Sequence, residues 1–432
     1  MESAAILALL IFVPTYLLIS VRNLKFVVLE RYAVVLFGAA LMVLLGVVSA
    51  TDALDAIDLG TLALLFGMML IVIGLELCGF FDWVALQIIK RSQTRFKLLA
   101  IEMVVIAVLS ALILNDTVVL LFTPIVVKTC IAIKANPVPY LVGEAVAANI
   151  GSVATPVGNP QNAFIAVQSG MSFNTFFTGL APIALVSLIV AVAIIYLVFR
   201  KDFTDGYKNG KNGLKNGRAI DSIDALERLR GKKVDKAVYL VLGILALVFL
   251  GFILSDSLGL PLALIAFIGG ASVLFLLPLK KKDVTAGAMV RKVDWTLLLF
   301  FVGLFVLLKG VSSSGLLGDM MNAFQSATGD GMDDVGGLTL FSALLSNLIS
   351  NVPAAMLLAP FVSDISSTNL WLALASSSTL AGNATILGAA ANIIVVEKAS
   401  AEGVEVSLKD FVKAGLPITV ITLLISILFL SI

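Results

Sequence analysis

The sequence predicts an all-α polytopic membrane protein, an inverted repeat of five spans in each half with two re-entrant hairpins and two broken helices. Three observations predict this fold class. Of the 432 residues, 60% are hydrophobic and 13% are charged, with a mean hydropathy of +1.08, whereas about one-quarter of the residues in soluble domains are charged. Lysine and arginine are confined to alternate connecting segments, and polar motifs of the first half recur in the second.

Eight uninterrupted apolar runs have about the length that a membrane-spanning helix needs. They are Ala5–Ser20, Ala33–Ala50, Leu59–Leu77, Phe176–Phe199, Ala237–Leu254, Pro261–Leu279, Trp295–Leu308 and Phe411–Leu430. The first run lacks the basic start and the A-x-A cleavage site of a signal peptide, so it is interpreted as a retained span. With no histidine and only Cys78 and Cys130 as cysteines, we expect no metal site and no disulfide framework.

The distribution of basic residues predicts the topology. Six connections hold 28 of the 29 lysines and arginines, and the exception is Lys309. These connections are Arg22–Arg31, Lys90–Lys97, Lys128–Lys134, Arg200–Lys236, Lys280–Lys292 and Lys398–Lys413. The positive-inside rule places them in the cytoplasm. We therefore expect ten full spans with both termini outside, in the cytoplasmic (inner) membrane of a prokaryote.

Shared motifs divide the chain into two halves. Asn115 recurs as Asn351 at an offset of 236 residues, and the pattern A-T-x-x-G-x-x-x-N at Ala154–Asn162 recurs at Ala384–Asn392 at an offset of 230. An odd number of spans in each half inverts the second half relative to the first, and inverted repeats are typical of secondary transporters.

This division predicts three parts of the chain. They are a first repeat at 1–199 with a hairpin at 98–133, a cytoplasmic linker at 200–236, and a second repeat at 237–432 with a hairpin at 338–362. The legs of the second hairpin, Leu338–Ile349 and Pro353–Val362, would reach only about 15–18 Å, whereas a bilayer core is about 30 Å thick. The first-half legs, Leu98–Leu114 and Val118–Ile133, are long enough to be two full spans, and the sequence leaves that alternative open.

Proline, glycine and asparagine interrupt two hydrophobic segments, at Gly151–Asn162 and Gly382–Asn392. Irregular backbone at membrane depth is tolerated only where it lines a cavity or is buried in protein, and helix N-termini there can bind an anion. Together with the hairpin tips, these breaks predict one substrate- or ion-binding site. Its candidate residues are Asn115, Asp116, Thr117, Thr155, Gly158, Asn159, Asn162, Ser350, Asn351, Thr385, Gly388 and Asn392.

Charged residues inside the predicted spans are costly and usually functional. Asp116 lies at the first tip, where its repeat partner is Val352, and it is predicted to carry the coupling proton or cation. Glu144 is either a second carrier or a hydrogen-bonded scaffold residue. Lys309 either extends to the membrane interface or pairs with Asp116. Glu102 is expected to be solvated at the cytoplasmic edge.

The tips "LNDT" and "ISNV" and the later "GNPQN" resemble the ion transporter superfamily, and most of all its arsenite-permease and bacterial anion-permease branch. The superfamily also includes divalent-anion/sodium symporters, whose tips both read Ser-Asn-Thr, and sodium/proton antiporters. The resemblance implies an elevator mechanism. It also implies that Asn115, Thr117, Ser350 and Asn351 face the substrate or ion.

These features predict a secondary transporter of a small inorganic anion or metalloid oxyanion, coupled to H⁺ or Na⁺. Arsenite or antimonite efflux is the sharpest candidate, because arsenite is mainly an uncharged hydroxide at neutral pH and would suit neutral amides and hydroxyls. A cation/proton (Na⁺/H⁺) antiporter using Asp116 and a dicarboxylate/sodium symporter are the alternatives, whereas an enzyme or a channel is not favoured.

The expected partners are a small inorganic solute and the lipid bilayer, with no nucleic acid. A second copy of the chain, forming a homodimer, is also expected. If the chain is an arsenite permease, a cytoplasmic ATPase subunit is expected as well. No cofactor is expected beyond Na⁺ or H⁺ as the coupling ion.

Overall fold

The computed structural model describes residues 2–20, 30–203, 234–316, 318, 334–365 and 367–432. Within these residues every regular element is a helix, so the all-α prediction is confirmed. Most of the predicted linker (204–233) and most of the first basic connection (22–29) lie outside the described residues. The predicted division into parts is not tested by the helices alone.

The predicted apolar runs are all helical, with ends shifted by a few residues. These helices are α1 Glu2–Ser20, α2 Arg31–Leu44, α4 Leu59–Leu77, α10 Phe173–Val198, α13 Val238–Ile253, α15 Leu262–Lys280, α17 Trp295–Ser313 and α23 Leu408–Leu430. Four further helices were not predicted from the sequence, namely α3 Ala50–Asp55, α5 Phe80–Arg91, α14 Ser255–Leu258 and α16 Ala286–Lys292. Among the described helices, α4, α10, α15, α17, α23 and Asn115–Ala132, the second leg of the first predicted hairpin, are each long and apolar enough to cross a membrane.

The two predicted hairpins are pairs of helices with very short turns. Helix α6 (Arg95–Leu112) meets α7 (Asn115–Ala132) through two residues, and α19 (Val335–Ile349) meets α20 (Asn351–Ile365) through Ser350 alone. One detail of the predicted tips is wrong. The sequence placed Asn115, Asp116 and Asn351 in the turns, whereas the structure places Asn115 and Asp116 at the start of α7 and Asn351 at the start of α20. Each second-half leg has 15 residues and reaches about 22 Å, still short of a bilayer core of about 30 Å.

The two predicted breaks lie where the sequence placed them. Seven residues separate the end of helix α8 (Val138–Ser152) from the start of α9 (Pro160–Ser169). Helix α21 (Thr368–Leu380) is followed by two single 3₁₀ turns, η1 (Ala381–Asn383) and η2 (Ile386–Gly388), before α22 (Ala390–Ala401). Proline at the first position of α9 suits a helix start because it has no N–H to leave unpaired.

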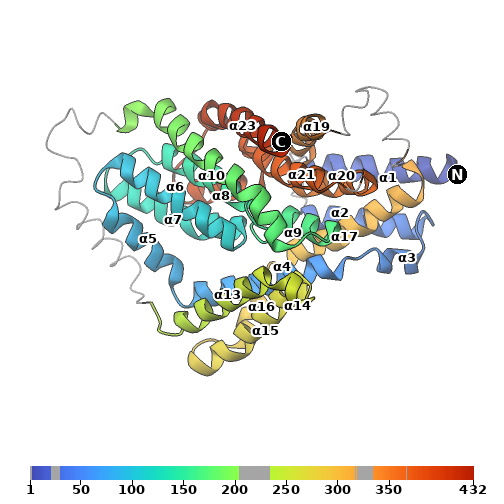
Figure 1. Ribbon diagram of the computed structural model, residues 1–432, viewed down its shortest axis with the longest axis horizontal. Helices are drawn as coiled ribbons and strands as arrows, with labels where there is room; N and C mark the ends of the chain where they lie inside the picture. Colours follow the sequence, from blue (N-terminus) through green and yellow to red (C-terminus); the bar gives the residue numbers. More distant parts are fainter. Residues whose placement is uncertain (1, 21–29, 204–233, 317, 319–333, 366) are drawn as a thin grey trace.

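Helices of each half pack against helices of the other half, an arrangement called the exchange below. Helix α4 packs against α15 and α17 packs against α2, and in the same way α7 packs against α22 and α20 against α9. Figure 1 shows α2 with α17 near the N-terminal end of the molecule and α15 with α4 along its lower edge. A pseudo-two-fold axis would relate the two contacts in each of these sets, so the exchange is consistent with the repeat, which stays a prediction.

The crossing of α4 and α15 brings two backbones into direct contact. A Cβ at Gly67 would collide with the carbonyl of Ala266, and a Cβ at Gly270 would lie 2.5 Å from the carbonyl oxygen of Gly67. At the other crossing, a Cβ at Gly303 would lie 2.6 Å from Cγ1 of Val35. Small residues allow this close approach, which is how helices associate in membranes.

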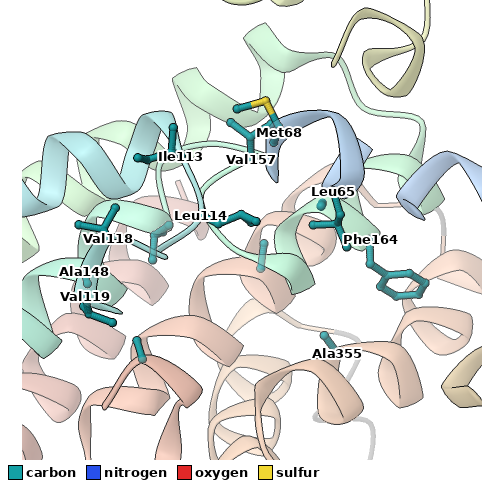
Figure 2. Packing of buried hydrophobic residues seen from close by; sticks show 14 of the residues in the cluster. Leu65, Met68, Ile113, Leu114, Val118, Val119, Ala148, Val157, Phe164 and Ala355 are labelled. Atoms are coloured by element: carbon teal, nitrogen blue, oxygen red, sulfur yellow. The ribbon is translucent and has the colours of Figure 1, made fainter. Parts of the chain in front are cut away.

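The turn of the first hairpin is held by apolar packing. Figure 2 shows Ile113 and Leu114 near Val157 of the first break, with Met68 of α4 close by. All four side chains are buried. Burial of these side chains fixes the start of α7, and with it the direction of the polar residues that follow Leu114.

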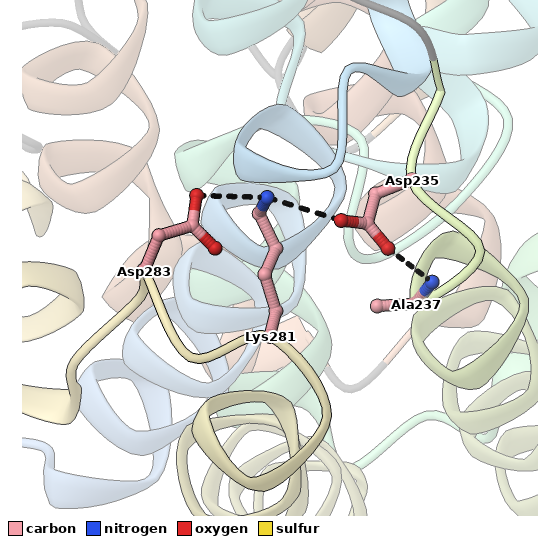
Figure 3. Close-up of polar contacts among 4 residues, drawn as sticks. All are labelled: Asp235, Ala237, Lys281 and Asp283. Carbon is pink, nitrogen blue, oxygen red and sulfur yellow. Dashed lines mark hydrogen bonds and ion pairs between the residues drawn. The ribbon is translucent and has the colours of Figure 1, made fainter.

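The described chain resumes at residue 234 beside an ion cluster, shown in Figure 3. Nζ of Lys281 lies 3.1 Å from Asp235 Oδ2 and 2.9 Å from Asp283 Oδ2. The N–H of Ala237 donates to Asp235 Oδ1 at 2.9 Å, and the N–H of Asp235 donates to the carbonyl of Cys78 at 3.1 Å. This cluster attaches the start of α13 to the ends of α4 and α15.

Candidate functional site

The starts of four helices meet at one cavity of about 450 Å³. Helices α7, α9, α20 and α22 contribute their N-terminal residues, and the starts of α2 and α17 form the facing wall. The lining residues are Glu30, Arg31, Tyr32, Asn115, Asp116, Pro160, Gln161, Asp294, Thr296, Leu297, Phe300, Ser350, Asn351, Val352, Pro353, Ala389, Ala390, Ile394 and Glu397. The cavity therefore lies where both tips and the far sides of both breaks converge.

Acidic side chains predominate in this lining. Glu30, Asp116, Asp294 and Glu397 are acidic, and Arg31 is the one basic residue among the lining residues described. The helix N-termini add partial positive charge, equivalent to about half a charge each. The six helix starts add about three positive charges, which offset the net charge of these side chains, so the lining as a whole is close to neutral and suits uncharged hydroxyl groups.

A smaller cavity of about 240 Å³ adjoins the first and shares Asp116 and Asp294 with it. Thr117 lines this smaller cavity and is absent from the larger one. At its wall, Nζ of Lys292 lies 2.6 Å from Oε1 of Glu76. Asp116 thus lies between the main cavity and a vestibule bounded by an ion pair.

The first tip is attached to the first break by its backbone. The N–H of Asn115 donates to the carbonyl of Gly158 at 2.9 Å, and its side-chain Oδ1 accepts from the N–H of Asp116 at 2.9 Å. A Cβ at Gly158 would collide with the carbonyl of Ser152. Gly158 is therefore a close-packing residue whose carbonyl is already used by the tip.

The second tip has a different backbone. Ser350 has φ 79° and ψ 157°, a region occupied almost only by glycine, and such a conformation costs about 1–3 kcal/mol. Asn351, with its amide oriented by its partners, donates from the side-chain nitrogen to the carbonyls of Ser378 (3.0 Å) and Gly388 (2.7 Å). The tip is thus held in a strained form against the second break.

Asn162 anchors the first break. Its Nδ2 donates to the carbonyls of Ser152 (3.0 Å) and Thr155 (3.2 Å). Asn159 caps α9 by accepting from the N–H of Asn162 at 2.8 Å, and its Nδ2 donates to Oγ of Ser152 at 2.9 Å. Backbone carbonyls of a broken helix can coordinate a cation, but the asparagine side chains already occupy these.

Asn392 anchors the second break in the equivalent way. Its Nδ2 donates to the carbonyls of Gly382 (2.6 Å) and Thr385 (2.9 Å), which match Ser152 and Thr155 at the offset of 230 residues. The N-cap position of α22 is Ala389, whose side chain makes no capping hydrogen bond. The break is anchored, but the start of its outgoing helix is not capped by a side chain.

Asn149 joins these parts and was not predicted from the sequence. It is fully buried on α8, and its Nδ2 donates to Oδ1 of Asn383 (3.0 Å) and Oδ1 of Asn392 (2.9 Å). Its Oδ1 accepts from Nδ2 of Asn115 at 3.3 Å. One side chain therefore links the first tip to the second break.

The repeat contained the signal that could have identified this position. Asn149 aligns with Thr379 at the offset of 230. Oγ1 of Thr379 accepts from Nδ2 of Asn159 (3.3 Å) and Nε2 of Gln161 (3.1 Å), both in the other half. Polar residues recur at this position because each one reaches the opposite break.

Several candidate residues do not line either cavity. Thr155 is buried and its Oγ1 donates to the carbonyl of Ala111 at 2.6 Å, and Thr385 is half-buried away from the lining. A Cβ at Gly388 would lie 2.7 Å from the carbonyl oxygen of Gly382, so this glycine also serves close packing. The candidates that line the main cavity are Asn115, Asp116, Ser350 and Asn351.

The remaining charged candidates lie elsewhere. Glu144 is fully buried and accepts from Oγ1 of Thr123 at 3.0 Å, outside both cavities. Lys309 is exposed on α17, about 20 Å along the helix from its start at Trp295, so it does not reach Asp116. The expectation that Glu102 is solvated is wrong, because this side chain is only 3% exposed.

Comparison with known proteins gives consistent matches. The family model described as citrate transporter (CitMHS) matches residues 7–370. The 46 kDa membrane protein of Mycobacterium leprae is 31% identical, with 99% of this chain and 98% of that protein covered. The silicon efflux transporter LSI3 of Oryza sativa subsp. japonica is 30% identical, with 94% and 93% covered.

Two more distant matches extend this result. The putative transporter arsB of Dictyostelium discoideum is 26% identical, with 91% of this chain and 85% of that protein covered. The crystal structure of the Alcanivorax borkumensis YdaH transporter superposes with a TM-score of 0.56 at 16% identity, covering 100% and 97% of the two chains. At that identity the superposition shows a shared fold alone.

Proposed function

This chain belongs to the CitMHS citrate transporter family, and we propose that within this family it exports a small metalloid hydroxide such as arsenous, antimonous or silicic acid. The chain is a multi-pass membrane transporter and not an enzyme, and the resemblance to the ion transporter superfamily is confirmed. The choice of solute is the step beyond the family.

The lining of the main cavity carries this proposal. Its polar groups combine the neutral amides and hydroxyls of Asn115, Gln161, Ser350 and Asn351 with an excess of carboxylates. A metalloid hydroxide is uncharged at neutral pH, so the carboxylates do not repel it, and they can accept hydrogen bonds from its O–H groups. The names of two relatives, a silicon efflux transporter and a putative arsB transporter, agree with this solute class.

Asp116 is proposed to couple transport to H⁺ or Na⁺. It lines both cavities, at the tip that meets the second half. A charged carboxylate at the centre of a membrane helix costs about 2.5–3.5 kcal/mol on insertion scales, and binding of a proton or cation at Asp116 would lower this cost. Glu144 is proposed as a second carrier.

The mechanism proposed is elevator-type alternating access between inverted repeats, with tips and breaks moving against a scaffold that contains α2, α4, α15 and α17. The exchanged helix pairs support the repeat. Under the topology expected from the basic residues, Arg31 and Lys292 are cytoplasmic, and both lie at the cavities described. The cavity would then be open toward the cytoplasm, as an exporter needs when it loads its solute.

A cation/proton antiporter is the second candidate, and the four acidic side chains in the lining favour it. Citrate, which the family description names, is highly charged and would need an accompanying cation in this cavity. The test therefore compares transport of metalloids, cations and citrate.

The test is solute flux in proteoliposomes that contain the full chain. Flux of arsenite, antimonite and silicic acid is compared with flux of Na⁺, Li⁺ and citrate, the last with and without Mg²⁺. We expect metalloid flux that Asn351→Ala lowers at least about tenfold, equivalent to about 1.4 kcal/mol, and that the exposed control Asn174→Ala leaves unchanged. Flux of cations or citrate without any metalloid flux would contradict the proposal.

A further inference from the structure

Two acidic side chains are buried outside the solute site. Glu102 on α6 is 3% exposed and Glu144 on α8 is fully buried. Neither residue lines the main cavity or its vestibule. The solute site described above therefore does not explain Glu102, and it does not explain why two carboxyl groups share one region.

Packing between α6 and α8 brings the two residues together. Gly143, which precedes Glu144, faces α6 so closely that a Cβ there would lie 3.0 Å from Cδ1 of Leu99 and 3.3 Å from Cγ of Met103. Glu102 lies between Leu99 and Met103 on the same helix, and it is near enough to interact electrostatically with Glu144. The two carboxyl groups thus lie in one seam, the contact surface between α6 and α8.

Helix α7 closes this seam. Oγ1 of Thr123 lies 3.0 Å from Oε1 of Glu144 and 2.8 Å from the carbonyl oxygen of Val119, and its single hydrogen is donated to one of the two. Glu102 lines a small cavity of about 20 Å³ between α5, α6 and α7, together with Thr129 and Cys130. A space of that size holds one water molecule, and Glu102 and Thr129 are the polar residues of its otherwise apolar lining. Glu102 therefore faces a compartment that is too small for a hydrated ion.

Each carboxyl group has one oxygen that lacks a partner among the described residues, Oε1 of Glu102 and Oε2 of Glu144. Arg95 lies in the neighbourhood of Cys130, and its guanidinium donates to the carbonyls of Asp202 (3.3 Å) and Lys134 (2.9 Å). The other titratable neighbours, Cys130 and Tyr140, are not cationic. Two negative charges in this position would be desolvated and would repel each other.

The fold does not require these carboxyl groups. Glu102 aligns with Leu338 at the offset of 236, and Glu144 aligns with Leu374 at the offset of 230. Both leucines are fully buried, so the second half fills the equivalent positions with apolar side chains. The first half has kept two polar groups where leucine packs, which indicates a use other than packing.

We propose that Glu102 and Glu144 form a proton-binding site, separate from the solute cavity, which exchanges protons through the small cavity beside α5. Both carboxyl groups are uncharged when the site is loaded, and loss of one proton leaves a single charge that Thr123 stabilises. Proton binding itself does not depend on which solute is transported. Its contribution to coupling rests on the proposed function.

Infrared spectroscopy of the full chain in lipid nanodiscs tests the site without any solute. Protonated carboxyl groups have a C=O stretch separate from that of carboxylates, and it shifts on exchange into D₂O. We expect this band at neutral pH, reduced in Glu102→Gln and in Glu144→Gln, and unchanged in the exposed control Glu405→Gln. The band should disappear as the pH is raised.

Two results would overturn the proposal. A wild-type spectrum whose protonated-carboxyl band is insensitive to both substitutions would show that the residues are charged. Loss of the band on addition of Na⁺ at constant pH would identify a cation site instead. If the glutamine variants fail to fold, the Glu102→Leu/Glu144→Leu variant, which copies the second half, replaces them and should fold without the band. Failure of metalloid flux leaves all of these readouts unaffected.

Discussion

The two ends of the site are built from the same parts but differ in what each presents to the cavity. In both breaks an asparagine, Asn162 or Asn392, donates to two backbone carbonyls that match at one offset. The first half then places Asp116 at its tip, and the second half places Val352 there. The features that both halves share account for the fold. The position at which they differ, Asp116 in one half and Val352 in the other, indicates where function resides.

The tips differ in backbone as well as in charge. Leu114, before the first tip, has φ −55° and ψ 123°, which any residue adopts, whereas Ser350 has φ 79°. The first tip is relaxed and carries a carboxylate, and the second is strained and neutral. Strain of this kind persists only where surrounding contacts impose it, and it gathers at binding and switching sites.

Removing the two anchors compares the breaks directly and has the largest expected effect on stability. Asn392→Ala loses two donated hydrogen bonds and the one accepted from Asn149. Asn162→Ala loses donated hydrogen bonds only, because Oδ1 of Asn162 has no partner among the described residues. We expect losses of about 3 and about 2 kcal/mol in the free energy of unfolding, because each buried group left unpaired costs about 1–3 kcal/mol. Unfolding in mixed micelles measures both, and equal losses would contradict the difference in bonding.

The two close-packed glycines sharpen the same comparison. A Cβ at Gly158 would collide with the carbonyl of Ser152, whereas one at Gly388 would have 2.7 Å to the carbonyl oxygen of Gly382. Overpacking costs about 1–3 kcal/mol, so Gly158→Ala should destabilise by about 2 kcal/mol and Gly388→Ala by less. Gly243→Ala, which meets nothing within 4 Å, is the control on a helix, and a melting temperature unchanged in Gly158→Ala would show that this packing is loose.

Relief of strain at the second tip should have a smaller and opposite effect. Ser350→Gly places a residue that tolerates positive φ at this position, and we expect thermal stability to rise by about 1 kcal/mol. The equivalent change Leu114→Gly removes a buried side chain from an unstrained position and should destabilise. If both changes destabilise, the tips are not different in strain.

The smallest expected effect lies outside the site, in the ion cluster of Figure 3. The N–H of Ala237 and the ammonium of Lys281 lower the pKa of Asp235. A lowered carboxyl pKa adds stability at pH values above the pKa of the unfolded state, which is about 3.9 for aspartate. This stability is lost as the pH falls through the pKa of the folded state. Asp235→Asn should therefore cost less than about 1 kcal/mol at pH 7, and the difference from wild type should vanish below about pH 3. A difference that persists in acid would assign the effect to packing.

Much of the fold could be predicted because its signals are local. Proline, glycine and asparagine at Gly151–Asn162 mark a break wherever they interrupt an apolar run, and the structure has a break there. Short legs around Ser350 likewise predicted a helix pair with a tight turn. The repeat strengthened both predictions, because a chance interruption would not recur in the other half.

The rest depended on contacts that no local pattern contains. Glu102 was expected to be solvated because the predicted topology places it near the cytoplasmic edge, but α5, which was not predicted, covers that face of α6. Asn149 lies in an apolar run, and its partners Asn383 and Asn392 are more than 230 residues away. Asp294 and Glu397 reach the cavity only through the exchanged packing of the two halves.

The central claim is that the two tips close one transport site and that only the first tip carries the coupling group. The most direct measurement is transport by Asp116→Asn in proteoliposomes, with and without a pH or Na⁺ gradient, beside the exposed control Asp364→Asn. The account predicts that gradient-driven transport falls at least about tenfold, or about 1.4 kcal/mol, while solute exchange at equal gradients remains within about twofold, or about 0.4 kcal/mol. Gradient-driven transport equal to that of wild type and of Asp364→Asn would contradict it.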